Sequence, residues 1–177
     1  MAFSTPQTFV AGNVLTAAQL NTDVRDNTAW LATDSPTARA YNSAAFSHTS
    51  TGNSLAITLD SERFDNAAMH DTSSNTARMT IPSGGDGKYL FGGSIEYASN
   101  GTGLRTIGVR SGGATFIATQ TFEASGTNVT TGSVCSVYSL AAAAYVEMTS
   151  YQNSGGNLNI NASSAYSPEF WIQWIRT

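Results

Sequence analysis

The 177-residue chain is short of charge and of long apolar runs. Only 11% of its residues are charged, and its eight lysines and arginines are scattered along a chain of net charge −4. Nucleic-acid binding needs clustered basic side chains, and a bilayer span needs about 20 consecutive apolar residues. We therefore expect neither a nucleic-acid partner nor membrane insertion.

Cysteine is almost absent, and so are the features of a secretory signal. The single Cys135 cannot form a disulfide within the chain, and no histidine motif accompanies it to activate a nucleophile. We expect it to be a small buried apolar residue. The first residues, MAFSTPQTF, contain neither a basic segment nor an apolar one. This predicts a protein that is made in the cytoplasm and that, if it ends up outside the cell, leaves by a route other than secretion.

The N-terminal region predicts an extended arm followed by one short helix. Residues 1–13 contain a proline and a glycine and show no helical periodicity. Thr16 and Gln19 form a capping box, which satisfies two free backbone groups at the start of a helix. The helix should end near Ala32, because an Asp-Ser-Pro sequence follows and proline disfavours helix in the residue before it.

The apolar positions of this helix are spaced three and four residues apart, which is the spacing of a self-associating seam. One of them, Asn27, is polar, and a single buried asparagine can fix register and oligomeric state. A seam of about two heptads is short, so a helix that lies on its own domain is the alternative. The positions are Ala17, Leu20, Val24, Asn27 and Leu31.

From Thr37 onward, short alternating or apolar runs are separated by turn residues, which predicts an antiparallel all-β sandwich. The best defined stretch, Lys88–Arg110, places two such runs around an Asn-Gly turn and predicts a hairpin at the centre of a sheet. The runs are Ala38–Phe46, Ser54–Leu59, Ala77–Ile81, Tyr89–Tyr97, Leu104–Arg110, Ala114–Phe122, Ser133–Leu140, Ala144–Tyr151, Asn157–Ala162 and Phe170–Ile175.

The last run is apolar on both faces, so both faces should be buried. No spare segment of the chain is expected to cover the outer face, which predicts that another copy covers it. Together with the helix seam, this gives a set of candidate interface residues: Leu20, Val24, Asn27, Leu31, Phe170, Trp171, Ile172 and Trp174.

The only dense group of acidic and histidine residues lies between positions 60 and 71. Its spacing matches neither a calcium-binding EF-hand loop nor a paired-histidine zinc site, so a solvated loop is the favoured interpretation. Asp65, His70 and Asp71 remain weak candidates for metal ligands. Asp60 and Glu62 could act as a glycosidase pair, but no motif selects them. We expect neither an enzyme nor a cofactor.

Several segments together resemble a known family. The runs GDGKYLFGGSIEYASNGTGLRTIGVRSGG, AAYVEMTSYQNSGGNLNI and SPEFWIQWI resemble, in this order, the trimeric jelly roll of tumour necrosis factor and the globular complement heads. The stretch FDNAAMHDTSSNTARMTIP resembles bacterial and phage members. The resemblance covers residues 37 to 177. It implies a jelly-roll β-sandwich that assembles as a homotrimer.

The opening segment FVAGNVLTAAQLNTDVRDNTAWL is similar to the N-terminal segment of structural proteins in phages of actinobacteria and their relatives. The two resemblances imply a bacteriophage virion protein that is released by lysis. Residues 1–36 would anchor it to other virion proteins and trimerise, and residues 37–177 would form the head.

The function implied is that of a short fibre or tail-tip component that contacts the host surface, with a host cell-surface glycan as candidate ligand. The alternative is a capsid decoration, or head fibre, that grips the shell through its arm. For a glycan, Tyr97, Tyr151 and Tyr166 lie beside turns where a sugar could stack, although core packing explains most aromatics in a sandwich.

Overall fold

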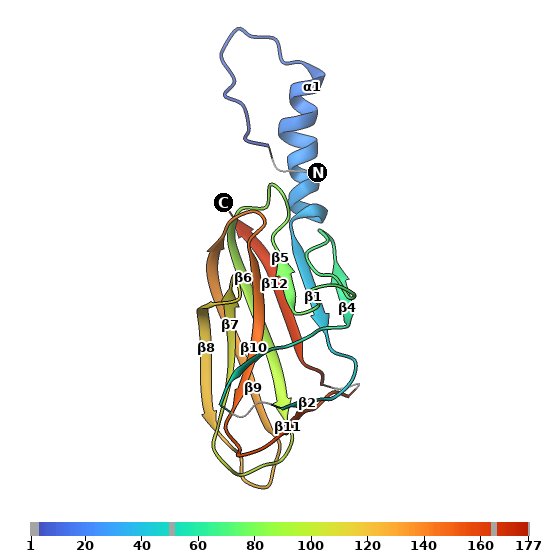
Figure 1. Cartoon of the computed structure of the whole chain (residues 1–177). Helices are drawn as coiled ribbons and strands as arrows, with labels where there is room; N and C mark the ends of the chain where they lie inside the picture. Colours follow the sequence, from blue (N-terminus) through green and yellow to red (C-terminus); the bar gives the residue numbers. More distant parts are fainter. Residues whose placement is uncertain (1–3, 50–51, 164–165, 177) are drawn as a thin grey trace.

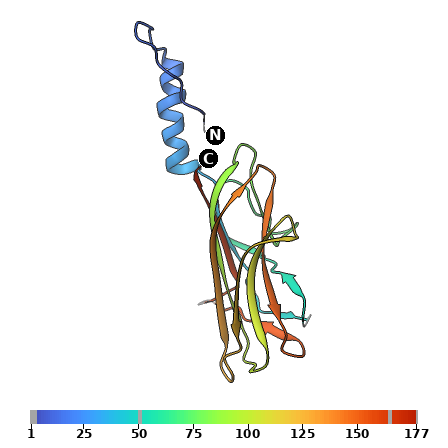
Figure 2. The ribbon, with the colours of Figure 1, turned by 90° about the vertical axis from the view of Figure 1, so that its left-hand side faces the viewer.

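The N-terminal helix projects from one end of a β-sandwich (Figures 1 and 2). The structure is a computed structural model that describes residues 4–49, 52–163 and 166–176. The helix winds continuously through α1 (Ala17–Leu20), η1 (Asn21–Asp26), α2 (Asn27–Ala29) and η2 (Trp30–Asp34), and both η segments have wide π-type turns. No helix among the described residues is long and apolar enough to cross a membrane.

The predicted start of the helix is confirmed. The Thr16 hydroxyl accepts a hydrogen bond from the backbone N–H of Gln19 at 3.2 Å, and the Gln19 side chain accepts one from the Thr16 N–H at 2.9 Å. The helix ends two residues beyond Ala32, where Ser35 takes an extended conformation before Pro36. Local capping chemistry thus sets both ends.

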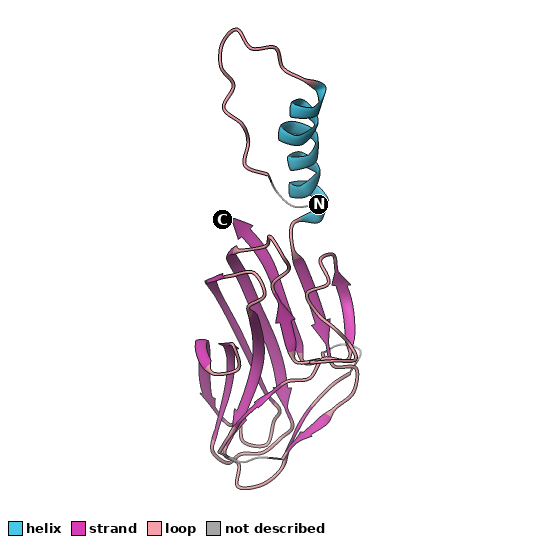
Figure 3. Cartoon of the chain, turned by 45° about the horizontal axis from the view of Figure 1, so that its top comes forward, coloured by secondary structure: helices cyan, strands magenta, loops and turns pink. Residues whose placement is uncertain are grey.

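The sandwich consists of two antiparallel sheets (Figure 3). One sheet has seven strands, in the order β2 (Phe46–His48), β11 (Leu158–Ile160), β6 (Gly87–Tyr97), β12 (Glu169–Arg176), β1 (Thr37–Tyr41) and β4 (Ser61–Asp65), with β9 (Thr130–Leu140) also paired to β6. The other has five, in the order β3 (Ser54–Ala56), β10 (Tyr145–Gln152), β7 (Leu104–Ser111) and β8 (Thr115–Glu123), with β5 (Arg78–Thr80) paired to β10. The predicted all-β class and sandwich architecture are confirmed.

The predicted hairpin across Lys88–Arg110 is wrong. Its two strands form as expected, but β6 and β7 belong to different sheets, and the Asn-Gly turn carries the chain from one to the other. Both edges of β6 are already occupied, because β9 pairs with its whole length and β12 with most of it. Tyr97 on β6 instead reaches across the sandwich, where its hydroxyl donates to the Thr106 carbonyl of β7 at 3.1 Å.

The core lies between the two sheets and takes the inward residues of alternating positions. Each large apolar side chain buried there contributes about 1.5–3 kcal/mol to folding. Strand β4, with the sequence SERFD, lies in the segment that was interpreted as a solvated loop. It forms as an edge strand through pairing with β1. The fully buried side chains of the core between the sheets include Tyr89, Phe91, Ile95, Tyr97, Ile107, Val109, Val146, Met148, Phe170 and Ile172.

Candidate assembly surface

The helix exposes four of its five predicted seam residues, including Ala17. Leu20, Val24 and Leu31 are 45%, 56% and 56% exposed, respectively. The helix stands clear of the sandwich instead of lying along it (Figure 2). The alternative of a helix that lies on its own domain therefore holds only at the helix end, where Trp30 packs on Trp174. Apolar side chains this exposed on an isolated helix need a partner to be stable.

Asn27 has a different role from the predicted one. Its side chain is buried by the N-terminal arm, and it accepts a hydrogen bond from the Ser4 N–H and donates one to the Ser4 carbonyl, both at 2.9 Å. A second link joins the Gln19 amide to the Gln7 side chain at 3.1 Å. Because its amide is satisfied within the chain, Asn27 holds the arm against the helix and is not a polar interface position.

The prediction that Phe170 and Ile172 lie at the interface is also wrong. Both point inward from β12 and have no exposed surface, because the core of their own chain covers them. Trp174 shares their face near the end of the strand, where it packs edge-to-face on Trp30 with ring centroids 4.6 Å apart. The expectation that no segment was free to cover the last strand fails at this position, since the end of the helix covers it.

Trp171 is the aromatic residue of β12 that points outward. Its indole lies against the backbone of β6: a Cβ on Gly92 would come within 2.6 Å of the ring. Strand register places Trp171 and Cys135 on either side of Gly92, and places Val137 beside Leu90. These residues therefore share the outer face of the seven-stranded sheet. We call Leu90, Gly92, Cys135, Val137 and Trp171 the assembly face.

The assembly face is apolar and partly open to solvent. Val137 is 50% exposed, while Leu90 and Trp171 are half-buried. Cys135 is exposed, so the expectation that it is a buried apolar residue is wrong: β9 turns it outward. Contiguous apolar side chains on the outside of a sheet are typical of protein interfaces.

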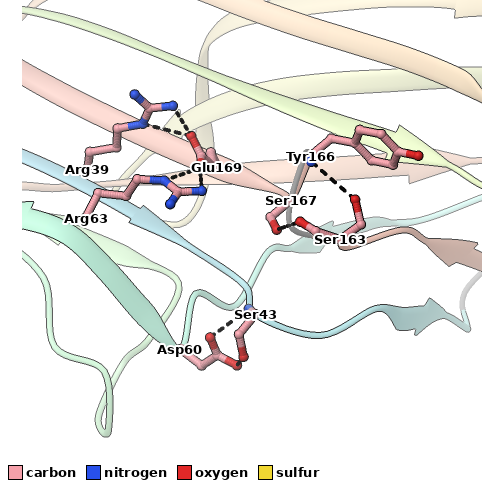
Figure 4. Close-up of polar contacts among 8 residues, drawn as sticks. All are labelled: Arg39, Ser43, Asp60, Arg63, Ser163, Tyr166, Ser167 and Glu169. Carbon is pink, nitrogen blue, oxygen red and sulfur yellow. Dashed lines mark hydrogen bonds and ion pairs between the residues drawn. The ribbon is translucent and has the colours of Figure 1, made fainter.

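A charged cluster borders the assembly face. Glu169, also on β12, is buried between two arginines and accepts hydrogen bonds from Arg39 Nε at 2.8 Å and Arg63 Nε at 2.6 Å (Figure 4). The Arg63 guanidinium also lies 4.4 Å from the centre of the Tyr41 ring. Strand pairing sets Arg39 beside Trp171, so the cluster marks the polar rim next to the apolar surface.

The weak metal candidates serve the loop in which they lie. The Asp65 carboxylate accepts the His70 N–H at 2.8 Å, and the His70 ring is held by Glu62 at 2.9 Å and by the Thr76 carbonyl at 3.0 Å. The Ser73 side chain and backbone donate to the Asp71 carboxylate, which lowers the pKa of Asp71. Within the described ranges, no group of three or more His, Cys, Asp or Glu residues gathers around a possible ion.

The carboxylate pair considered for a glycosidase is divided between separate roles. Asp60 accepts hydrogen bonds from the backbone and hydroxyl of Ser43, both at 2.8 Å (Figure 4). Glu62 faces His70 instead. Each carboxylate is thus bound to a neighbouring segment of its own chain.

The two sheets, their strand order and the shared core define a jelly-roll sandwich of the tumour necrosis factor and complement-head type. The chain is similar to murine APRIL, with a TM-score of 0.58 and 6% identity over 78% of this chain and 98% of that one. It is also similar to the globular domain of the zebrafish complement 1qA protein, with a TM-score of 0.53 and 13% identity over 80% and 99%. No family model and no curated protein matches the sequence. The structural likenesses establish the fold alone.

Proposed function

We propose that this chain is a homotrimeric structural protein of a bacteriophage virion, of the short-fibre or tail-tip type, that contacts the host surface and has no catalytic role. One observation carries the trimeric part of the proposal: a single chain leaves two apolar surfaces without a partner. These are the assembly face on the sandwich and the line of Leu20, Val24 and Leu31 on the helix. The virion part rests on the resemblance of the opening segment to phage structural proteins.

Identical copies are the partners that suit both surfaces. The jelly roll of tumour necrosis factor and the complement heads, which this fold resembles, is trimeric. In a trimer, each subunit would place its assembly face against a neighbour while the three helices meet on one axis. Burying one exposed leucine or valine fully contributes about 1.5–3 kcal/mol, so three helix residues per subunit offset part of the cost of association.

The arm supports the proposed attachment to other virion proteins through residues 1–36. It runs alongside the helix from Ser4 and turns back at Gly12, where the Asn13 N–H donates to the Val10 carbonyl at 3.2 Å, before the chain enters the helix. Its turn lies at the end of the molecule farthest from the sandwich (Figure 1). Apolar residues at this turn are exposed and suit a docking pocket on another protein: Phe9, Val10, Val14 and Leu15.

The same arm supports the second candidate, a capsid decoration trimer that grips the shell. Both candidates require a trimer and an inserted arm, and they differ in where the arm binds. Sedimentation equilibrium of the purified chain should give three times the mass of one chain, and a monomer at micromolar concentration would refute the proposal. Gold-labelled antibodies on intact virions would then place the protein on the tail tip or on the capsid.

A further inference from the structure

The outer face of the five-stranded sheet carries a groove of about 300 Å³, at the small end of ligand sites. Strands β3, β7, β8 and β10 form it, on the opposite side of the sandwich from the assembly face. Its lining consists of two aromatic residues, Phe116 and Tyr151, and five serine or threonine side chains. A trimer built through the seven-stranded sheet leaves this groove turned outward.

The floor of the groove brings one aromatic ring and the hydroxyls together. Gly108 of β7 lies beneath Phe116 of β8: a Cβ there would come within 3.0 Å of the ring and 3.1 Å of the Thr149 hydroxyl. Phe116 remains 47% exposed, so part of its ring is open to the groove. Absence of a side chain at Gly108 is thus what allows the ring to lie low across the sheet.

The hydroxyls differ in how they are engaged. Thr106 and Thr121 bond to each other at 2.8 Å, and Thr149 donates to the Gly108 carbonyl at 3.3 Å. The hydroxyl of Thr119 is exposed and makes no hydrogen bond to the described residues. A hydroxyl can both donate and accept, so this lining suits a ligand that itself carries hydroxyl groups.

No charged side chain lines the groove. An anion would find no cation there, and a purely apolar ligand would leave the hydroxyls without partners. A saccharide meets both conditions, since its C–H face packs on an aromatic ring while its hydroxyls bond to threonine. We propose that the groove between Phe116 and Tyr151 binds a neutral saccharide. This deepens the proposed function, on which it rests for the source of the sugar, a polysaccharide of the host surface.

The test uses the full chain on an array of neutral hexose and pentose oligosaccharides, with hexuronate oligosaccharides as charged comparators. The strongest neutral binder is then titrated by calorimetry. We expect Phe116→Ala to weaken binding about tenfold or more, equivalent to about 1.4 kcal/mol. Thr119→Val, which keeps the shape of the side chain, should weaken it about threefold. The matched control is Phe64→Ala on β4, because Phe64 is similarly exposed at 49% but lies on the other sheet.

Three results would overturn the inference: no neutral saccharide binds, hexuronates bind best, or Phe116→Ala binds as well as the wild type. A lower oligomer mass for Phe116→Ala would also overturn it, because the groove would then be a contact between copies. Sedimentation of the same samples separates this inference from the proposed function. A trimer that binds no sugar would refute only the saccharide site. A monomer that binds sugar through Phe116 would refute only the proposed trimer.

Discussion

Two tryptophans on one strand should respond oppositely to truncation. Trp171 points outward from β12 onto the assembly face, whereas Trp174 packs on Trp30 within its own chain. We expect Trp171→Ala to weaken the trimer and largely to spare the subunit. Trp174→Ala should destabilise the subunit and largely spare the trimer. The pair is a matched comparison, since the residue type, strand and substitution are the same.

The magnitude follows from the area that each ring can still bury. A tryptophan removes about 200 Å² from water when fully covered, or about 5 kcal/mol at about 25 cal/mol per Å². Its own sheet already covers most of Trp171, so assembly should add at most about 2 kcal/mol per subunit. Three copies contribute at most about 6 kcal/mol, which is up to about four orders of magnitude in the trimer association constant. Trp174→Ala should instead cost about 3 kcal/mol of subunit stability through its lost core contacts.

Sedimentation equilibrium across a dilution series measures association, and urea unfolding measures the stability of the subunit. Dissociation of the Trp171→Ala trimer at concentrations where the wild type and Trp174→Ala remain assembled would support the assembly face. An unchanged association constant for Trp171→Ala would refute the reasoning, since a tryptophan that buries the rest of its ring on assembly cannot be removed without weakening association. Loss of assembly in Trp174→Ala alone would place the interface at the helix end.

Three further outcomes are expected. Glu147 is buried between two arginines. Glu147→Gln should therefore lower the free energy of unfolding by about 1–3 kcal/mol in urea titrations. The control Glu123→Gln, at an exposed position, should change it by less than about 0.5 kcal/mol. Burial lowers the pKa of His48 in the folded protein, so the unfolded chain takes up the proton first as the pH falls below about 6.5. The free energy of unfolding therefore declines from that pH toward the lower folded pKa. His48→Gln should flatten this decline, which thermal midpoints between pH 7 and 5.5 would measure. Asn27→Ala removes both bonds to Ser4 and should speed hydrogen exchange of the Ser4 amide at least about tenfold, a loss of about 1.4 kcal/mol; an unchanged rate would show that the arm is held elsewhere.

Local chemistry made the helix and most strands predictable. The Thr16–Gln19 capping box fixed the helix start, because its two hydrogen bonds involve neighbours in sequence. Period-two alternation predicted β6 and β7, because it also depends only on residues close together in sequence. Strand partners were not predictable this way: alternation tells which side of a strand is apolar but not which strand lies beside it, so the turn after Tyr97 was mistaken for a hairpin.

The candidate interface shows a similar division. The last strand is apolar on both faces, so its sequence does not tell which face turns to the core of its own chain. Phe170 faces that core, whereas Trp171 faces outward. Asn27 was misread because its partner, Ser4, lies 23 residues away in an arm with no regular structure. The groove at Phe116 was missed altogether. Its signal was an aromatic ring on β8 that reaches over a glycine of β7. Phe116 pairs with Arg110, two residues from Gly108, so this contact becomes visible only when the register of β7 and β8 is known.

The scarcity of charge leaves large parts of both outer sheet surfaces uncharged, because most charged groups of the sheets gather in two clusters. Four of the eight basic residues form two similar clusters, in which Glu147 on one sheet and Glu169 on the other are each held between two arginines. A fifth, Arg105, is buried and donates to backbone carbonyls of the turn that joins the sheets. Because these cations are bound to neighbouring groups of their own chain, the remaining outer surface is left to apolar and hydroxyl side chains. Such a surface suits contacts with identical subunits on one sheet and with a neutral ligand on the other.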